Sequence, residues 1–432
     1  MNSSRQSTVL FGVNCMTPWR ALQWVRLMRS RLGLGAGPAI AMVLVATLAG
    51  CSRAEDNPAA KGGSREPASA KKLAGITYWN DKKPEIPWSI HIVKLDRAQA
   101  DLVFTSTLAR NTVFGLSTLG SQIGSVPASV GKPVVGINGD FYVVDHGPYI
   151  GDPRGLQIMN GEVVSAPTDQ VVFWIDATSQ PHSAHVESKF TLTWPDGATS
   201  PLKLNEERSA RESVLYTPRL GPSTRAVGGR EVVVAREADS PWLPLTIATH
   251  YTLKVTEVRD TGDTSLKGDR MVLSFGAKVA NAATLVVGSI LKISTGTDPE
   301  LSGVRFAIGG GNIMIFQGVV QDIQIPSGGA YKYRSVLERH PRSAVGFNRT
   351  HIFLVEVDGR QPDLSVGMTL HELGEYMRGL GCEEAMNFDG GGSSTLWVDG
   401  KVVNSPCNGS ERDIGNGLVV VRKPTEQAAG GK

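Results

Sequence analysis

Short runs of β-branched and aromatic residues dominate the chain from residue 88 onward, and clusters of glycine, proline and polar residues separate them. Apolar runs of this length between turn residues predict β-strands. Turn signals such as Pro-Asp-Gly between neighbouring runs predict hairpins. The clearest predicted strands are residues 90–95, 102–107, 134–138, 163–164, 171–175, 190–194, 231–235, 251–255, 271–275, 352–357, 385–389 and 418–421.

One stretch has helical spacing instead. Thr369 and Glu372 have the separation of a capping box, in which each side chain satisfies a backbone N–H group at the start of a helix. The apolar residues that follow fall on one helical face, and glycines end the pattern. Because predicted strands lie before and after it, this helix forms a crossover in a strand-dominated chain. The predicted fold class is α+β, with strand-rich mixed sheets, few helices, and a site at strand ends and glycine-rich turns.

The composition supports a folded chain and excludes two classes of protein. The chain has 432 residues, of which 41% are hydrophobic and 20% charged, enough apolar residue for a sizeable core. Its 49 glycines and 24 prolines exclude a long coiled coil. Five of the 44 basic residues lie in residues 1–50, which have no acid, so the remainder carries 39 basic and 41 acidic residues. With no overall positive field on that remainder, nucleic acid is excluded as a partner.

Residues 1–50 have the build of a secretory signal peptide, with arginines, then a short apolar run, then small residues. The apolar run is shorter than the ~20 residues that a transmembrane helix needs. Met28 is followed by Arg-Ser-Arg and would open a more compact signal, so we interpret Met28 as a candidate for the true start.

The segment Leu48-Ala-Gly-Cys51 resembles a bacterial lipobox. That resemblance implies that Cys51 is lipidated and becomes the first residue of the mature protein. A plain cleaved signal with an incidental cysteine is the alternative. Ser52 follows, where lipoproteins of the inner membrane often carry Asp. We therefore expect an exported protein of the bacterial cell envelope, anchored by lipid at Cys51 to the outer membrane and facing the periplasm.

The rest of the chain divides by composition. Residues 51–72 are rich in Ala, Gly, Ser, Pro and Lys and predict a flexible tether, and residues 424–432 predict a disordered tail. Residues 73–423 are predicted to form the folded domain, with a β-rich central part at 187–300 that the sequence does not assign to a separate module.

Two of the four cysteines lie in this predicted domain, Cys382 and Cys407. In an oxidising compartment two such cysteines are expected to pair. A disulfide closing this loop would stabilise the fold by about 3 kcal/mol. Two separate thiols are the alternative.

Several common catalytic motifs are absent. The segment His371-Glu-Leu-Gly-Glu375 has the outline of a zinc-protease helix, but Glu375 stands where the second histidine ligand must be. The sequence has no P-loop and no Gly-x-Ser-x-Gly nucleophile elbow.

The segment from Asn387 to Thr395 carries the most chemical information. Asp389 ends a predicted strand and is followed by Gly390, Gly391 and Gly392, and then by Ser393. Three glycines allow a ligand to approach the backbone closely, and consecutive N–H groups there can form an anion-binding nest. The alternative is a tight turn that Asp389 caps. Polar turns also adjoin other predicted strands, at residues 136–142, 307–311, 340–346 and 411–416.

In this order, over about residues 130–422, these segments resemble the phosphodiester glycosidase family, which includes the lysosomal uncovering enzyme. The resemblance is carried by Asn-x-Asp-Gly-Gly-Gly-Ser, by Pro-Arg-Ser-Ala-Val-Gly and by the helix around Glu372. It implies hydrolysis of the bond between a sugar C1, such as that of N-acetylglucosamine, and a phosphodiester, releasing free sugar and a phosphomonoester. The residues at the matching positions are Asn138, Arg342, Glu372, Asn387, Asp389, Gly390, Gly391, Gly392, Ser393 and Arg412. At Asp140 the family often has a small residue, which argues against a general catalytic role there.

The implied chemistry suits these residue types. A phosphomonoester with a second pKa of about 6 is a good leaving group, so phosphate recognition matters more than a strong general acid. Arg342 and Arg412 can donate to the phosphate in pairs. Asp389 is the candidate to stabilise or attack C1, or to activate water. Glu372 is the candidate second carboxylate, or only a helix cap, and Asn138 can bind sugar hydroxyls or cap its turn.

Several alternatives remain open at this stage. Arg154 either contacts substrate or lies on a solvated turn. The sequence requires no cofactor, and oxygen ligands at Asp389 are chemically compatible with a divalent cation such as calcium or magnesium. The predicted partners are a phosphoglycan or other sugar-1-phosphodiester and, through Cys51, the membrane. The competing functions are a non-catalytic envelope glycan-binding protein and a different phosphoester hydrolase.

Overall fold

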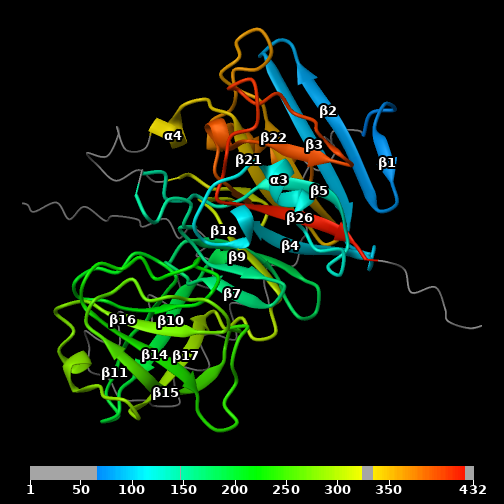
Figure 1. Ribbon diagram of the computed structural model, residues 1–432. Coiled ribbons are helices and arrows are strands. Elements are labelled where there is room, and N and C mark those ends of the chain that lie inside the picture. Colours follow the sequence, from blue (N-terminus) through cyan, green and yellow to red (C-terminus); the bar gives the residue numbers. More distant parts are fainter. Residues whose placement is uncertain (1–65, 146, 324–333, 424–432) are drawn as a thin grey trace, which may run out of the picture. The chain divides into compact units, whose positions relative to one another are not determined.

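The computed structural model describes residues 66–145, 147–323 and 334–423, all within one compact unit, Gly62–Lys432 (Figure 1). The predicted signal peptide, the lipidation site Cys51 and the predicted tail lie outside the described residues. Strand β1 begins at Lys71, inside the segment predicted as a tether. Among the described residues, no helix is long and apolar enough to cross a membrane.

The described residues fold into four sheets, two of eight strands and two of five, so the strand-rich α+β class is confirmed. The helices among them are α3 (Leu119–Gly124), α4 (Arg334–Leu337) and α5 (Leu370–Gly379). Short 3₁₀ turns are η3 (Ala109–Asn111), η4 (Ala280–Thr284) and η5 (Gly391–Ser393).

Sheet I contains the strands on either side of the predicted crossover helix. Strands β22 and β23 both pair antiparallel with β21, so they run parallel to each other, and α5 connects them. In spatial order, the strands of sheet I are β1 (Lys71–Leu73), β2 (Ile76–Lys83), β3 (Trp88–Asp96), β22 (His351–Val357), β21 (Arg342–Phe347), β23 (Glu384–Asn387), β19 (Ile313–Phe316) and β20 (Val319–Val320). Because β23 ends at Asn387, the predicted strand 385–389 is two residues too long, and Asp389 lies beyond it.

Sheets II and III are the five-stranded sheets. In spatial order, sheet II contains β25 (Lys401–Val402), β24 (Leu396–Val398), β5 (Lys132–Asn138), β26 (Asn416–Arg422) and β4 (Leu102–Leu108). Sheet III contains β7 (Glu162–Ser165), β6 (Gln157–Met159), β18 (Phe306–Gly309), β8 (Val171–Ile175) and β9 (Pro181–His185).

Sheet IV is built only from the central part of the chain, and its strands are green in Figure 1. Its one parallel pair is β12 with β13, whereas its other neighbours are antiparallel. In spatial order, its strands are β11 (Thr199–Pro201), β10 (Glu187–Thr193), β17 (Ile290–Asp298), β15 (His250–Arg259), β14 (Arg230–Arg236), β16 (Met271–Phe275), β13 (Ser213–Tyr216) and β12 (Lys203–Leu204).

One apolar cluster joins sheets I, II and III, and its members include Val93, Ile137, Phe173, Ile308 and Leu418. Burial of such side chains, at about 25 cal/mol per Å² of apolar surface, is the main force that holds the sheets together. A second cluster packs sheet IV against side chains of sheet III. The ends of strands from sheets I and II therefore meet over a common core, and the polar segments predicted from the sequence follow those ends.

The predicted helix and its cap are confirmed as α5. Thr369 accepts a hydrogen bond from the Glu372 backbone N–H, and the Glu372 carboxylate accepts one from the Thr369 N–H, which completes the capping box. Leu370, Leu373 and Met377 are buried on one face, as the helical spacing predicts.

The predicted disulfide is wrong, because Cys382 and Cys407 are both free thiols. Cys382 is 3% exposed and belongs to the apolar cluster beneath α5, and this burial raises the pKa of its thiol. Cys407 lies partly exposed in the loop after β25, where its sulfur donates to the Asn408 side chain at 3.6 Å. The two side chains have separate surroundings, which sequence separation alone does not reveal.

Candidate active site

The polar segments at three strand ends come together around the side chain of Asn138, the last residue of β5. Its Nδ2 atom donates to the Asp389 carbonyl at 2.7 Å, and its Oδ1 atom accepts from the Ser343 hydroxyl at 2.5 Å and the Thr395 N–H at 3.1 Å. The Asp389 N–H donates in turn to the Gly139 carbonyl at 3.0 Å. Asn138 is 1% exposed, and its hydrogen bonds position the glycine-rich loop between sheets I and II. Of the two roles that the sequence left open, sugar binding or capping a turn, these bonds favour the positioning one.

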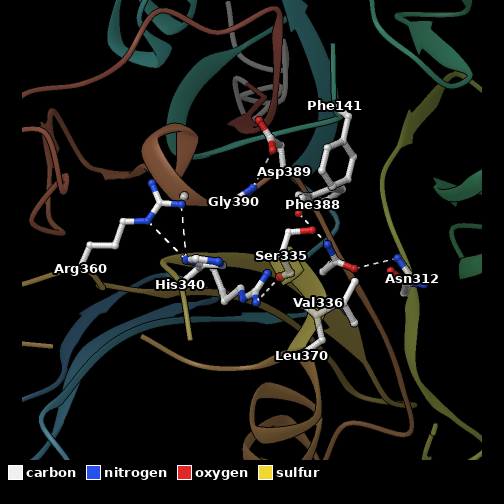
Figure 2. Close-up of a pocket in the computed structure, with 13 residues that line it drawn as sticks. Phe141, Asn312, Ser335, Val336, His340, Arg360, Leu370, Phe388, Asp389 and Gly390 are labelled. Carbon is white, nitrogen blue, oxygen red and sulfur yellow. Dashed lines mark hydrogen bonds between the residues drawn. The ribbon is translucent and has the colours of Figure 1, made fainter. Parts of the chain in front are cut away.

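A cavity of about 220 Å³ lies beside this loop (Figure 2). Five of the predicted site residues line it, namely Arg342, Asn387, Asp389, Gly390 and Gly391. The other lining residues are Phe141, Asn312, Ser335, Val336, His340, Arg360, Leu370 and Phe388. The predicted residues Asn138, Glu372, Gly392, Ser393 and Arg412 are not part of its wall.

Asp389 is a half-buried carboxyl on the cavity wall. Burial raises its pKa above the ordinary value, and the Ser393 hydroxyl, the Gly390 N–H and the charges of Arg412 and Arg154 act in the opposite direction. The Gly390 N–H donates to Asp389 Oδ1 at 2.9 Å. A carboxyl whose pKa is raised by burial, and which lies near cationic side chains, is the kind of group that serves as nucleophile or base.

Asp140 is a second acid near Asp389, and it is buried at 2% exposure. Burial raises its pKa to about 8, the negative charge of Asp389 adds to the shift, and the Gly155 N–H opposes it. That N–H donates to Asp140 Oδ2 at 2.6 Å, whereas Oδ1 has no hydrogen-bond partner among the described residues. Asp140 is therefore mostly protonated and neutral at pH 7.

The anion-binding nest predicted for the glycines is wrong for two of them. The Gly390 N–H is taken by Asp389, and the Gly391 N–H donates to the Pro341 carbonyl at 2.9 Å. Because they lack a Cβ, these glycines instead allow other parts of the protein to lie close to the loop backbone. Gly391 has φ +64°, and a Cβ there would lie 2.9 Å from Nη2 of Arg360.

Arg342 holds the segments around the cavity. Its Nε atom donates to the Met368 carbonyl at 2.7 Å, and Nη2 donates to the carbonyls of Ser335 and Glu338 at 2.5 and 2.8 Å. Burial, with the nearby charge of Arg360, lowers its pKa to about 10, so it remains a cation at pH 7. Arg342 therefore contributes positive charge at the cavity wall while three of its bonds stabilise the protein.

Arg360 is a site residue that the sequence interpretation missed. It is exposed on the cavity wall, and Figure 2 shows its guanidinium joined to His340, with Nε and Nη2 each 3.4 Å from Nδ1. Its backbone has φ +58°, a conformation that costs free energy in a non-glycine residue and often occurs at functional sites. Its position three residues after the predicted strand 352–357 was the signal that could have found it.

Two further arginines act on Asp389 from outside the cavity wall. Arg412 is exposed, with its guanidinium 5.9 Å from the centroid of the Tyr142 ring, and Arg154 is also exposed. Both lower the pKa of Asp389. The surroundings of Asp389 are therefore strongly cationic, which suits an anionic ligand.

Glu372 and Asn387 have positioning contacts. The Glu372 carboxylate forms an ion pair with Arg339 at 2.5 Å as well as the helix cap, and both lower its pKa. Asn387 Oδ1 accepts from the Asn312 N–H at 2.7 Å, which fixes the turn beside it. The structure thus places Glu372 as a helix cap and salt-bridge partner, away from the cavity wall.

A half-buried carboxyl beside a cavity and several arginines, at the ends of strands in an α+β fold, is an arrangement that suits an anionic ligand. The model of the phosphodiester glycosidase family matches residues 252–421. The resemblance drawn from the sequence motifs is therefore confirmed, and residues 252–421 are similar to the phosphodiester glycosidase family.

Individual relatives agree with this assignment. The chain is 34% identical over 111 residues to the N-acetylglucosamine-1-phosphodiester alpha-N-acetylglucosaminidase of Mus musculus, which is 25% of this chain and 21% of that protein. The match thus spans about a fifth of the length of that relative.

Two solved structures have a similar fold. A hypothetical protein from Synechocystis has a TM-score of 0.64 at 20% identity, over 81% of this chain and 63% of the other. A candidate exported protein from Burkholderia pseudomallei has a TM-score of 0.61 at 22% identity, over 77% of this chain and 74% of the other.

The three hydrogen bonds of the Asn138 side chain lead to a stability prediction. Asn138→Ala leaves the Asp389 carbonyl, the Ser343 hydroxyl and the Thr395 N–H unpaired in a buried place, so we expect the free energy of unfolding to fall by about 2–4 kcal/mol. Chemical denaturation followed by circular dichroism measures this change. The exposed Asn281→Ala is the control and is expected to change it by less than about 0.5 kcal/mol. Equal losses of unfolding free energy in the two variants would contradict a stabilising role for these hydrogen bonds.

The raised pKa of Asp140 leads to a pH prediction. Its pKa rises from 3.8 to about 8 on folding, so the folded state takes up a proton between these values. The free energy of unfolding of the wild type is therefore expected to fall as pH rises from about 4 to about 8, relative to Asp140→Asn, which cannot titrate. Thermal melts of both proteins across this range test it. A constant difference between them at every pH would show that Asp140 is ionised throughout.

Proposed function

We propose that this chain is an exported hydrolase that cleaves the glycosidic bond of a sugar-1-phosphodiester, such as an N-acetylglucosamine-1-phosphodiester, to free sugar and phosphomonoester. The observation that carries the proposal is the half-buried Asp389 on the wall of a cavity whose surroundings are cationic. The family match and the likeness to the mouse glycosidase support it.

In this proposal the arginines bind the phosphodiester and Asp389 acts at C1. The bond from C1 to the phosphate oxygen breaks, the electron pair leaves with the phosphate, and water supplies the hydroxyl of the free sugar. Arg360, which is exposed on the cavity wall, donates to the phosphate. Arg342, which is buried at the same wall, adds positive charge. The Asp389 carboxylate attacks C1 or activates the water, and both routes use the same position on the wall.

We also propose that the protein works outside the cytoplasm. The support is the signal-like sequence of residues 1–50 and the lipobox resemblance ending at Cys51. A structure of similar fold also comes from a candidate exported protein. The substrates would then be sugar-1-phosphodiester linkages of capsule, teichoic-type or other phosphoglycans in the cell envelope.

Asp389→Asn tests the proposed chemistry. With N-acetylglucosamine-α-1-phospho-6-methylmannoside as substrate, we expect the variant to release free sugar at least about 1,000-fold more slowly than the wild type, because the amide neither attacks C1 nor takes a proton. We expect its melting temperature to stay close to that of the wild type, because the Asn side-chain oxygen can still accept from the Gly390 N–H. Free sugar and phosphomonoester are measured separately.

The exposed Asp413→Asn is the matched control and is expected to keep wild-type activity. Full activity in Asp389→Asn would show that the carboxyl has been assigned wrongly. Release of a phosphosugar by the wild type would indicate a different phosphoester hydrolase. Binding of the substrate with no turnover would indicate a glycan-binding protein.

Arg360→Gln tests phosphate recognition. Loss of one charge-assisted contact to the phosphate is expected to raise KM about tenfold, with little change in kcat if the contact is equally strong in the ground and transition states. Because Arg360 is exposed, the melting temperature should hardly change. Arg349→Gln, an exposed arginine outside the cavity wall, serves as control. An unchanged KM in Arg360→Gln would remove Arg360 from substrate binding.

A further inference from the structure

A second group of ionisable side chains lies inside sheet I, apart from the cavity wall. His91 on β3 and Glu356 on β22 are register partners in neighbouring strands, so their side chains share one face of the sheet. Asp358 follows the end of β22. One ligand atom from each of the three residues lies within 4.8 Å of the others, and His91 Nε2 is 3.1 Å from Asp358 Oδ2.

The group is buried and carries an unsatisfied acid. His91, Glu356 and Asp358 are 6%, 0% and 1% exposed. Both carboxylate oxygens of Glu356 lack a hydrogen-bond partner among the described residues. Burying an acid in this way is costly unless a cation or a donor compensates. Burial and Asp358 raise the pKa of Glu356 well above its ordinary value, and the nearby Asn404 amide acts in the opposite direction. One N–H of Asn404 Nδ2 donates to the Ser394 carbonyl, and its Oδ1 accepts from the Leu396 N–H.

The other two side chains are oriented as metal ligands usually are. His91 Nδ1 lies 2.9 Å from the Tyr78 hydroxyl, so with its proton on Nδ1 the ring directs the Nε2 lone pair at the two acids. Asp358 Oδ1 accepts from the Ser405 N–H at 2.7 Å, which leaves Oδ2 facing the histidine.

Two neutral groups also approach His91 Nε2, namely Asn80 Nδ2 at 3.0 Å and Ser89 Oγ at 3.4 Å. They are hydrogen-bonded to one another at 3.0 Å, so an ion at Nε2 does not leave either one unpaired. Neither donates to Glu356, whose two carboxyl oxygens lack a hydrogen-bond partner among the described residues. A divalent cation would bind Glu356 together with His91 and Asp358, which lie on β22, on β3 and directly after β22.

We propose that His91, Glu356 and Asp358 form a buried structural site for a divalent transition metal, Zn²⁺ or Mn²⁺. One imidazole nitrogen with two carboxylates is a mixed donor set that these ions accept, whereas calcium and magnesium prefer oxygen alone. The site is separate from Asp389, which belongs to no group of three or more such side chains among the described residues.

The position of the group gives such an ion a structural role. Asp358 holds the backbone of Ser405, and the adjacent Asn404 holds Ser394 and Leu396, which follow the glycine-rich loop. A metal bound here therefore connects strands β3 and β22 to the segment that supports the loop of Asp389. This inference does not depend on the proposed function, because metal content and melting temperature are measured without substrate.

The test uses the full chain without a polyhistidine tag, expressed with added Zn²⁺ and Mn²⁺ and then dialysed. Elemental analysis is expected to find about one equivalent of metal in the wild type and less than about 0.2 in Glu356→Gln, which lacks the carboxylate ligand. After chelation with EDTA, a hundredfold excess of ZnCl₂ or MnCl₂ over Kd is expected to raise the wild-type melting temperature by about 5 °C. Glu356→Gln should show no such rise.

Glu356→Gln is suited to this test because it keeps the size of the side chain and removes a buried charge, so the metal-free variant should be at least as stable as the metal-free wild type. Asp176→Asn, which breaks a partly exposed His–Asp pair with His182, is the matched control and should retain the metal. The proposal is overturned if the wild type holds no metal and none of the ions shifts its melting temperature, if only CaCl₂ does so, or if Glu356→Gln binds as the wild type does.

Discussion

The arrangement of the candidate active site depends on the side chain of one buried asparagine. Asn138 ends a strand of sheet II, yet its three hydrogen bonds go to β21 of sheet I and to both ends of the glycine-rich loop. The apolar cluster between the sheets brings these strands together without specifying how their ends align. Directional bonds at the rim of that cluster supply the alignment, and Asp389 then has a defined place between the two sheets.

The glycines of the loop determine how closely two arginines can approach it. Without a Cβ, Gly391 allows Arg360 to approach the loop, and Gly392 leaves room for Arg412. The N–H groups of Gly390 and Gly391 are used inside the protein, so anion binding here depends on guanidinium groups, with the glycines making space for them. The same sequence pattern would suit either arrangement, and the positions of the Asp389 carboxyl and the Pro341 carbonyl decide between them.

Features set by neighbouring residues were predictable from the sequence, and those set by distant residues were not. The capping box of Thr369 and Glu372 spans three residues, and the strand patterns are local, so both were found. The pairing of Cys382 with Cys407 was predicted wrongly, because burial of Cys382 beneath α5 depends on contacts across the fold. The group of His91 and Asp358 joins residues 267 positions apart, which no spacing rule detects.

The distribution of charge around Asp389 supports the class of substrate that we propose. A neutral Asp140 removes one negative charge from its surroundings, while Arg342, Arg360, Arg412 and Arg154 supply positive charge on several sides. A neutral glycoside would gain little from so many cations, since its leaving oxygen develops charge late and needs a proton donor. A phosphodiester carries its charge in the ground state and keeps it on departure, so in the reaction that we propose it would gain from this arrangement at every step. If Asp140 were ionised, a second carboxylate would oppose this binding, and its deep burial prevents that at neutral pH.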